Sequence, residues 1–203
     1  MSKIEIEFKS QLEENINIHQ DMLKISKDIV DVIENIKKRL KKDGKLLFCG
    51  NGGSAADAQH LAAEFIVRLR SHINRKPIPA LTLAQDTSTL TACGNDYSFD
   101  DIFLRPFQAL AKKNDILLCI STSGNSKNIL NVLKEAKKTK IYSVCFLGKG
   151  GGKAKRLANK SLIIPSNNTA RIQECHIFLG HFILEKIEDS LLSKKKIRFD
   201  FPK

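Results

Sequence analysis

The chain has 203 residues, of which 42% are hydrophobic and 28% are charged. A chain of this length can bury one substantial core and is short for two ordinary domains, so we expect a single domain. Residues 1–20 are charged and polar and contain no apolar stretch typical of a signal peptide, and no later segment has the length and apolarity of a membrane span. We therefore expect a cytoplasmic protein with no membrane partner.

The net charge of +12 comes from 34 Lys and Arg residues against 22 Asp and Glu residues. A basic surface can attract nucleic acid or an anionic substrate. Most lysines are spread over helical segments such as 27–45 (KDIVDVIENIKKRLKKDGK), and no basic stripe interleaved with aromatic residues is present. The pattern favours a solvated, lysine-rich surface and does not predict nucleic-acid binding, while an anion-attracting cleft remains an alternative.

The cysteines are far apart in the chain and include no CxxC pair, and their number, five, is odd. Three of them lie inside apolar runs that resemble strands: Cys49, Cys119 and Cys145. This usage predicts reduced core thiols of a cytoplasmic protein and not a disulfide framework or a cysteine metal site.

Apolar residues recur at three- and four-residue spacing from Lys3 to Lys42, which predicts two amphipathic helices or one bent helix. The Asp43-Gly44 pair is a natural helix stop. We assign residues 1–43 to an N-terminal helical segment. Because this segment lacks residues with obvious catalytic chemistry, we expect it to pack against the domain or against a partner subunit.

From residue 44 onward, short apolar runs alternate with helical stretches. This alternation is typical of an α/β fold, here a three-layer αβα sandwich with a central parallel sheet, and we assign it to one domain over 44–192 followed by a basic tail, 193–203. Ligands of such sheets bind beyond the carboxyl ends of the strands. The strands are predicted at 45–49, 79–84, 114–121, 141–148 and 160–166, and the helices at 54–69, 99–113, 127–138 and 169–192.

The segment 119–130 (CISTSGNSKNIL) ends a predicted strand and begins a helix. Hydroxyl groups and free N–H groups at the positive end of a helix dipole form a site for a dianion such as a phosphate monoester. One hydroxyl is enough to cap a helix, and this segment has more than capping requires. The segment does not match the GxxxxGK[ST] pattern of nucleotide triphosphatases. The hydroxyl residues are Ser121, Thr122, Ser123 and Ser126.

A second glycine-rich loop lies in 49–64 (CGNGGSAADAQHLAAE). Its glycines permit close backbone approach to a ligand. The loop matches the dinucleotide fingerprint only in a relaxed form, with Ala55 at the last position, and the acidic residue expected on the ribose is missing. We therefore predict no nicotinamide or flavin cofactor.

His60 and Glu64 are four positions apart on the predicted helix 54–69, so both project from one face. This is a spacing of metal ligands, although such a pair is often only solvated. The last helix adds Gln173 and His181, whose eight-residue separation corresponds to about 12 Å along a helix axis. A metal shared by both would need a bent helix, long side chains reaching inward, or ligands from two subunits, and the sequence leaves these alternatives open.

Several motifs occur in the order and at the separations of one known family. GNGGSAADAQHLAAE, TACGNDYSFDDIF, ISTSGNS, LGKGGGKA and RIQECHIFLGH together resemble the phosphoheptose isomerases, also called sedoheptulose 7-phosphate isomerases, of the SIS (sugar isomerase) family. The resemblance extends over about residues 5–192. It implies the SIS fold and a homotetramer that assembles through helices, with active sites at subunit contacts.

The resemblance also implies a reaction and a set of roles. The implied reaction is the isomerisation of sedoheptulose 7-phosphate to D-glycero-D-manno-heptose 7-phosphate through an enediol, the first step of nucleotide-activated heptose biosynthesis for lipopolysaccharide or capsule. Glu64 would be the catalytic base and His181 the acid, with one zinc ion per subunit. The implied zinc ligands are His60, Glu64, Gln173 and His181. The implied substrate-binding residues are Asn51, Gly52, Gly53, Ser54, Glu64, Arg68, Asn95, Asp96, Ser121, Thr122, Ser123, Ser126 and Gln173.

Two other readings belong to different functional classes. A non-catalytic SIS protein that binds the replication initiator is similar over the same length, but it lacks acid–base residues at the positions of Glu64 and His181. A sugar-phosphate-sensing regulator would need a DNA-binding domain, and residues 1–43 contain no turn typical of a recognition helix. The residue types present therefore favour the enzyme.

Overall fold

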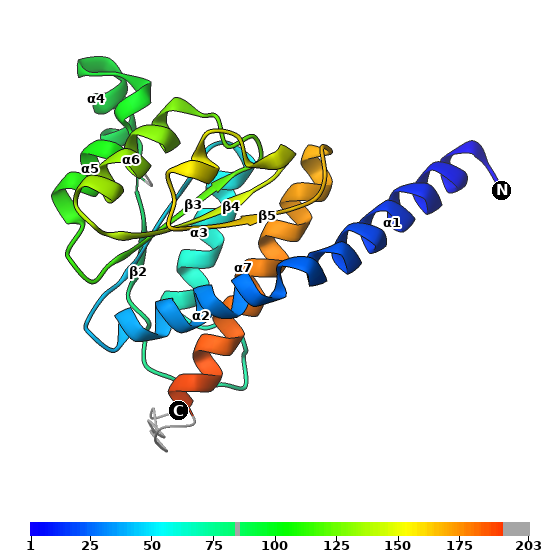
Figure 1. The fold of residues 1–203 in the computed structure, drawn as a ribbon, viewed down its shortest axis with the longest axis horizontal. Helices are drawn as coiled ribbons and strands as arrows, with labels where there is room; N and C mark the ends of the chain where they lie inside the picture. Colours follow the sequence, from blue (N-terminus) through cyan, green and yellow to red (C-terminus); the bar gives the residue numbers. More distant parts are fainter. Residues whose placement is uncertain (84–85, 193–203) are drawn as a thin grey trace.

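The computed structural model describes residues 1–83 and 86–192. Its centre is a five-stranded parallel sheet in the order β2-β1-β3-β4-β5 (Figure 1). Each strand overlaps a run predicted from the sequence, with β1 extending one residue beyond its run, so the prediction of an α/β fold with a central parallel sheet is confirmed. The predicted basic tail, 193–203, lies outside the described residues. The strands are β1 (Leu46–Gly50), β2 (Ala80–Thr82), β3 (Ile116–Ser121), β4 (Tyr142–Leu147) and β5 (Lys160–Ile163).

Helices surround the sheet and connect its strands. Short 3₁₀ turns are η1 (Met22–Ile25), η2 (Phe99–Asp101), η3 (Lys149–Gly151) and η4 (Ala154–Arg156). No helix of the described ranges is long and apolar enough to cross a bilayer. The α-helices are α1 (Lys3–Asp21), α2 (Ser26–Leu40), α3 (Gly53–Ile66), α4 (Thr87–Asp96), α5 (Leu104–Leu110), α6 (Lys127–Lys138) and α7 (Thr169–Leu192).

Alternate residues of each strand point to opposite faces of the sheet, and both faces are buried. Phe48 and Phe146 belong to a core that also contains residues of α2, α3 and α7. Leu47 and Leu147 belong to a second core with residues of α5 and α6. The strands therefore form the middle of three layers, with their hydrophobic runs covered on both sides.

The cysteines are buried and unbridged. Cys49, Cys119 and Cys145 lie in register on β1, β3 and β4, and the Sγ atoms of Cys49 and Cys119 are 3.4 Å apart. Burial raises the pKa of the Cys119 thiol, so this side chain stays protonated. These positions agree with the expected core thiols.

Helix α1 extends away from the body as an arm, seen in blue in Figure 1. A capping box begins it, in which the Ser2 hydroxyl accepts a hydrogen bond from the Glu5 N–H at 3.3 Å. Only its C-terminal end joins the core, where Ile18 and Met22 are buried. Since η1 separates α1 from α2, the predicted N-terminal helices are found as two helices with a bend between them.

Three elements differ from the sequence prediction. The predicted helix 99–113 is found as the 3₁₀ turn η2 and the shorter helix α5, which ends at Leu110. Helix α3 ends at Ile66 and not at residue 69, because the Arg75 guanidinium donates to the carbonyls of Glu64 at 2.7 Å and Phe65 at 2.9 Å. Helix α4 was not predicted, since its threonines and Gly94 are poor helix formers. Its start is fixed by Asp86, whose carboxylate accepts from the Thr89 N–H at 2.7 Å.

Candidate functional site

The strand order places the two glycine-containing loops beside each other. β1 pairs with both β2 and β3, so the order β2-β1-β3-β4-β5 reverses direction between β1 and β3. In doubly wound sheets of this order, the crevice at such a switch point, outside the carboxyl ends of the strands, binds the ligand. The segments that follow β1 and β3 and lead into α3 and α6 occupy this position.

The loop between β3 and α6 is folded around Gly124. The Ser121 hydroxyl accepts a hydrogen bond from the Gly124 N–H at 3.1 Å, and the Ser123 hydroxyl accepts one from the Asn125 N–H at 3.2 Å. Ser126 has the extended backbone of an N-cap, yet its side chain makes no capping hydrogen bond to α6. The predicted hydroxyls thus surround the start of a helix, and that of Ser126 is not used as the cap.

The glycine-rich turn at residues 148–152 packs against this loop. Gly124 has a φ of 63°, and a Cβ there would lie 2.2 Å from the Gly151 carbonyl oxygen. The Ala154 N–H donates to the Gly124 carbonyl at 2.9 Å, and the Lys153 N–H donates to Asn125 Oδ1 at 3.0 Å. The LGKGGGKA segment of the sequence therefore holds the loop between β3 and α6 in place. This loop, residues 121–126, is called the hydroxyl loop below.

An amide pair joins the two loops. Asn51 Nδ2 donates to Asn128 Oδ1 at 3.0 Å, and Asn128 Nδ2 donates to Asn51 Oδ1 at 2.9 Å. Asn128 is buried in the first turn of α6, and its Oδ1 also accepts from the Ile129 N–H at 2.9 Å. Sequence reasoning named Asn51 and missed Asn128. Its only signal in the sequence is an amide residue two positions after Ser126.

Gly53, the first residue of α3, lies against Gln173 of α7. A Cβ on Gly53 would be 2.2 Å from Gln173 Nε2, so the Gln173 side chain would have to shift if this residue carried a side chain. Gly52 before it has a φ of 56° and a ψ of −123°, which favours glycine. Ser54 is buried just behind them. The structure thus brings the predicted residues Gly52, Gly53, Ser54 and Gln173 together at one end of α3.

Two turns further along, α3 and α7 meet again. A Cβ on Gly180 would lie 2.4 Å from Leu61 Cδ2, so the helices approach closely at this point. Because Gly53 faces Gln173 and Leu61 faces Gly180, the two helices run side by side in the same direction. The close approach places His60 and His181 opposite each other, with their Nε2 atoms 2.8 Å apart.

Glu64 completes this cluster on α3, with Oε1 3.8 Å from His60 Nε2. Burial and the neighbouring His60 lower the pKa of His181, which keeps its imidazole neutral at neutral pH. Neutral imidazole nitrogens and a carboxylate oxygen are the donors that zinc prefers, so this donor set fits a zinc ion chemically.

Gln173 lies away from the histidine pair. It is eight positions before His181 on the same helix, which corresponds to about 12 Å along the axis. Within the part of the chain that the structure describes, no group of three or more His, Cys, Asp or Glu side chains is arranged to hold a metal ion. In the described single chain, His60, Glu64 and His181 therefore do not form a metal site by themselves, and the axial separation of Gln173 from His181 remains.

Asp57 is a further polar residue beside the cluster, and sequence reasoning missed it. It lies one turn before His60 on α3, and its Oδ2 is buried without a hydrogen-bond partner among the described residues. Burial raises the pKa of Asp57, and the nearby His60 partly opposes this shift. A buried carboxylate oxygen in this position needs a partner that residues 1–83 and 86–192 of the single chain do not supply.

Three predicted residues lie outside these groupings. The predicted helix 54–69 would place Arg68 one turn beyond Glu64 on the same face, and this is wrong, because α3 ends at Ile66. Asn95 and Asp96 are exposed at the end of α4, where Asn95 Nδ2 donates to Asp96 Oδ1 at 2.7 Å. The resemblance alone assigns substrate contacts to them.

Comparison with known proteins identifies close relatives. The SIS domain family model matches residues 12–148. A phosphoheptose isomerase of Clostridium acetobutylicum is 44% identical over 192 residues, covering 95% of this chain and 96% of the relative. One of Aquifex aeolicus is 46% identical over 169 residues, covering 83% and 87%.

Solved structures give the same result. The structure of a phosphoheptose isomerase from Francisella tularensis superposes with a TM-score of 0.87 at 33% identity, covering 93% of this chain and 100% of that one. A phosphoheptose isomerase from Neisseria gonorrhoeae gives 0.85 at 38% identity, covering 92% and 100%.

Proposed function

Because the chain belongs to the phosphoheptose isomerase family of SIS-domain proteins, we propose that it converts sedoheptulose 7-phosphate into D-glycero-D-manno-heptose 7-phosphate. Family membership makes the protein an isomerase of heptose phosphates. The observation that carries the finer proposal is the meeting of His60, Glu64 and His181 between α3 and α7, since an acid–base pair is what such an isomerisation needs.

The substrate phosphate would bind at the loop between β3 and α6. Hydroxyls of Ser121, Thr122, Ser123 and Ser126 surround the positive end of the α6 dipole, which attracts a dianion. The glycine turn behind the loop and the Asn51–Asn128 pair restrict its movement. A loop held in this way binds the phosphate with little loss of conformational freedom.

The proton transfers would involve Glu64 and His181. Glu64 removes a proton from C1 of the ketose, the C1–H electron pair forms the C1=C2 bond, and the C2 carbonyl oxygen takes the N–H proton of the neutral His181 imidazole. The O1 proton of the enediol then passes to His181, which restores the acid, and protonated Glu64 gives its proton to C2, which gives the aldose and restores the base. Both transfers stay on one face of the sugar if a single base serves C1 and C2.

His60, Glu64 and His181 would hold a zinc ion, with Gln173 as a fourth ligand. When bound, zinc supplies Lewis-acid stabilisation of negative charge on the enediol oxygens. The neutral state of His181 suits such a ligand. The distance between Gln173 and His181 along α7 favours a site completed by a second subunit.

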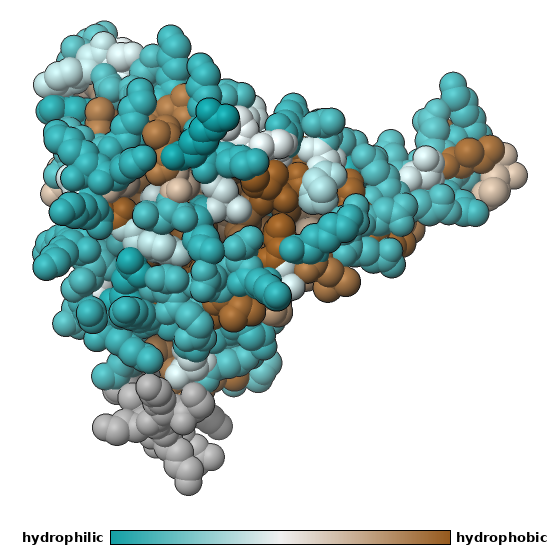
Figure 2. All heavy atoms as spheres, in the orientation of Figure 1, coloured by the Kyte–Doolittle hydropathy of each residue, from teal (hydrophilic) through white to brown (hydrophobic). Residues whose placement is uncertain are grey.

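We further propose a homotetramer. Helix α1 exposes apolar side chains that a single chain leaves in water, among them Ile4, Phe8 and Leu12. Figure 2 shows apolar side chains at the tip of the arm and where it leaves the body. Phe178 and Phe182 of α7 stack with ring centroids 6.4 Å apart and are also partly exposed. Light scattering on the purified protein tests this: a tetramer mass supports it, and a monomer contradicts both the assembly and a shared site.

The test of the reaction is a discontinuous assay of aldose phosphate formed from sedoheptulose 7-phosphate, before and after chelation and with zinc restored. We expect turnover that zinc restores and that Glu64→Gln reduces by about 10²–10⁴-fold, the usual contribution of a general base. Arg156→Gln is a control with the same loss of one charged group away from the cluster, and it should keep its activity.

The outcomes separate the parts of the proposal. Turnover that is unchanged after chelation would contradict the role of zinc but would still support the isomerase activity. Absence of turnover at every metal loading would contradict the isomerase and favour a non-catalytic SIS protein. The protein can also be incubated with a mixture of sugar phosphates. If an aldose phosphate other than the heptose phosphate accumulates, a different substrate is assigned to the enzyme. If the product enters nucleotide-activated heptose synthesis, for lipopolysaccharide or capsule, the reaction would be the first step of that pathway.

A further inference from the structure

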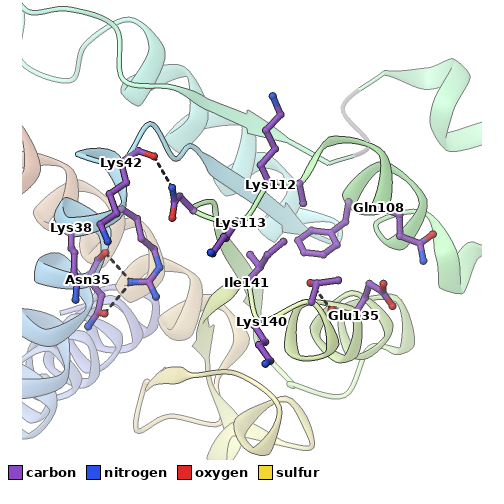
Figure 3. A pocket seen from close by; sticks show the side chains of 14 residues that line it. Asn35, Lys38, Lys42, Gln108, Lys112, Lys113, Glu135, Lys140 and Ile141 are labelled. Atoms are coloured by element: carbon purple, nitrogen blue, oxygen red, sulfur yellow. Dashed lines mark hydrogen bonds between the residues drawn. The ribbon is translucent and has the colours of Figure 1, made fainter.

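A cavity of about 880 Å³ lies at the edge of the sheet opposite the hydroxyl loop, where β1, β3 and β4 begin (Figure 3). Its walls come from the last turns of α2, from the end of α5 with residues 111–114, and from the end of α6 with residues 139–141. Ligands of parallel sheets usually bind at the other edge. The ligand site at the carboxyl ends of the strands therefore does not involve this cavity.

The cavity is strongly basic. Of its lining residues only Glu135 is acidic, and this carboxylate is 3.7 Å from Lys138, which lies outside the cavity. The basic lining residues are Lys38, Arg39, Lys42, Lys112, Lys113 and Lys140.

Helix ends explain only part of this charge. Three helices end at the cavity, and each helix C-terminus carries a partial charge of about −0.5, which lysines often balance. Together with Glu135, these ends offset fewer than half of the basic side chains. Lys112, Lys113 and Lys140 also lie beyond the last residues of α5 and α6. An excess of about three positive charges remains.

Several lysines elsewhere in the described chain form ion pairs. Lys37 pairs with Glu34 at 2.6 Å, Lys45 with Asp115 at 2.5 Å, and Lys160 with Asp31 at 2.8 Å. None of the five cavity lysines has a carboxylate within ion-pair distance in the ranges 1–83 and 86–192. No ion pair within these ranges therefore relieves their mutual repulsion, and a bound anion would reduce it.

One cation is fixed while the others can adjust. The Arg39 guanidinium lies 4.0 Å above the centroid of the Tyr142 ring, and its Nη1 donates to Asn35 O and Oδ1 at 3.2 and 3.1 Å. Phe107 and Ile141 form a buried apolar floor. A planar guanidinium held over an aromatic ring, with flexible ammonium groups around it, is suited to several phosphate groups at once.

We propose that this cavity binds an oligophosphate, a chain of linked phosphates that is either inorganic or attached to a nucleoside. Its volume lies within the usual range for small-molecule sites, roughly 300–1,000 Å³. Walls on three sides favour a compact ligand over an extended nucleic-acid strand or a membrane surface. The charge excess favours several phosphates over the single phosphate of a sugar phosphate.

The experiment is a calorimetric titration of the full-length protein with inorganic tripolyphosphate, with excess sedoheptulose 7-phosphate present to occupy the hydroxyl loop. We expect saturable binding of one tripolyphosphate per chain that weakens as salt rises, because the lysines are solvent-exposed. Lys112→Glu combined with Lys113→Glu should weaken binding by about tenfold or more. The matched control, Lys27→Glu with Lys137→Glu, reverses the charge of two exposed lysines that do not line the cavity. It should change the affinity for tripolyphosphate by less than about threefold.

A parallel titration with a nucleoside triphosphate distinguishes the two sources. Tighter binding than tripolyphosphate would assign the wall at Arg39 to the nucleoside, and equal binding would assign the site to the phosphates alone. Equal weakening by the cavity pair and the control pair would overturn the proposal, since binding would then follow net charge only. Binding that sedoheptulose 7-phosphate abolishes would place the anion at the hydroxyl loop and overturn it too.

Discussion

The Nε2 atoms of His60 and His181 lie 2.8 Å apart, although the residues are 121 positions apart in the chain. They meet because Gly180, the neighbour of His181, has no side chain and leaves space for Leu61, the neighbour of His60. A Cβ at Gly180 would lie 2.4 and 2.5 Å from the two Cδ atoms of Leu61. The distance between α3 and α7 is thus set by one glycine beside the proposed catalytic cluster.

Gly180→Ala should destabilise the protein and lower its turnover. Overpacking costs about 1–3 kcal/mol, which exceeds the gain of about 0.5–1 kcal/mol from replacing glycine in a helix. Separation of α3 and α7 would also displace His60 from His181. Urea unfolding and the isomerase assay measure the two effects.

Gly94→Ala in α4 is the matched control, because a Cβ there meets nothing within 4 Å. This variant should gain stability by up to about 1 kcal/mol and keep its activity. Adding Leu61→Ala to Gly180→Ala should restore part of the lost turnover. Equal effects of the two glycine variants would show that the close approach does not set the helix spacing.

Asn128→Ala should loosen the two loops of the switch point. It leaves the Asn51 amide and the Ile129 N–H without their partners, which costs about 1–3 kcal/mol in a buried position. We expect a raised KM for the sugar phosphate with a smaller change in kcat. Asn131→Ala is the control on the same helix, since Asn131 Nδ2 donates only at the surface turn around Asp100 and should affect KM little.

Much of the fold followed from local pattern. The apolar runs of β1, β3 and β4 are buried on both faces, so their hydrophobicity is continuous and easily recognised. The bounds of α6 and α7 coincide with the predicted ranges 127–138 and 169–192. Helix α4 escaped prediction because Asp86 and tertiary packing, and not intrinsic propensity, stabilise it.

The site was predictable where its residues are neighbours in the sequence and not where they meet through packing. The hydroxyl loop and the His60–Glu64 spacing are local patterns. The end of α3 depends on Arg75, eleven positions beyond Glu64, which captures the last carbonyls, so the placement of Arg68 on the helix was wrong. The partners Asn128 and Gly180 are distant in sequence, and only the packed structure reveals what they contact.

His176 should make the protein sensitive to acid. Its ring is fully buried against Phe146, and this burial lowers its pKa from 6.5 to about 4. Above pH 6.5 the imidazole is neutral in both the folded and the unfolded chain and contributes no pH dependence. As the pH falls toward 4, the unfolded chain takes up the proton and the folded chain does not, so the free energy of unfolding decreases by up to about 3 kcal/mol.

Urea unfolding at several values between pH 7.5 and pH 4 checks this behaviour. His176→Phe should remove most of the decrease, because the apolar ring has no proton to bind. The exposed His72 provides the control, and His72→Gln should leave the pH profile unchanged. A decrease that persists in full in His176→Phe would assign the acid sensitivity to other groups.

Glu188→Gln should produce the largest loss of stability among these variants. The carboxylate is fully buried on α7 and binds Arg75 Nε at 2.5 Å and Arg70 Nε at 2.9 Å. Removing its charge leaves the buried Arg75 guanidinium uncompensated, which costs about 3–5 kcal/mol. Chemical denaturation measures this loss.

The effect should reach the proposed catalytic base, because Arg75 also holds the carbonyl of Glu64 at the end of α3. We expect Glu188→Gln to lower kcat under conditions in which the protein is still folded by circular dichroism. Asp189→Asn is the matched control: its carboxylate also binds Arg70 but is 43% exposed, so the variant should lose less than about 1 kcal/mol and keep kcat. Similar losses from Glu188→Gln and Asp189→Asn would mean that burial does not decide the strength of this network, and that the end of α3 is held by the backbone alone.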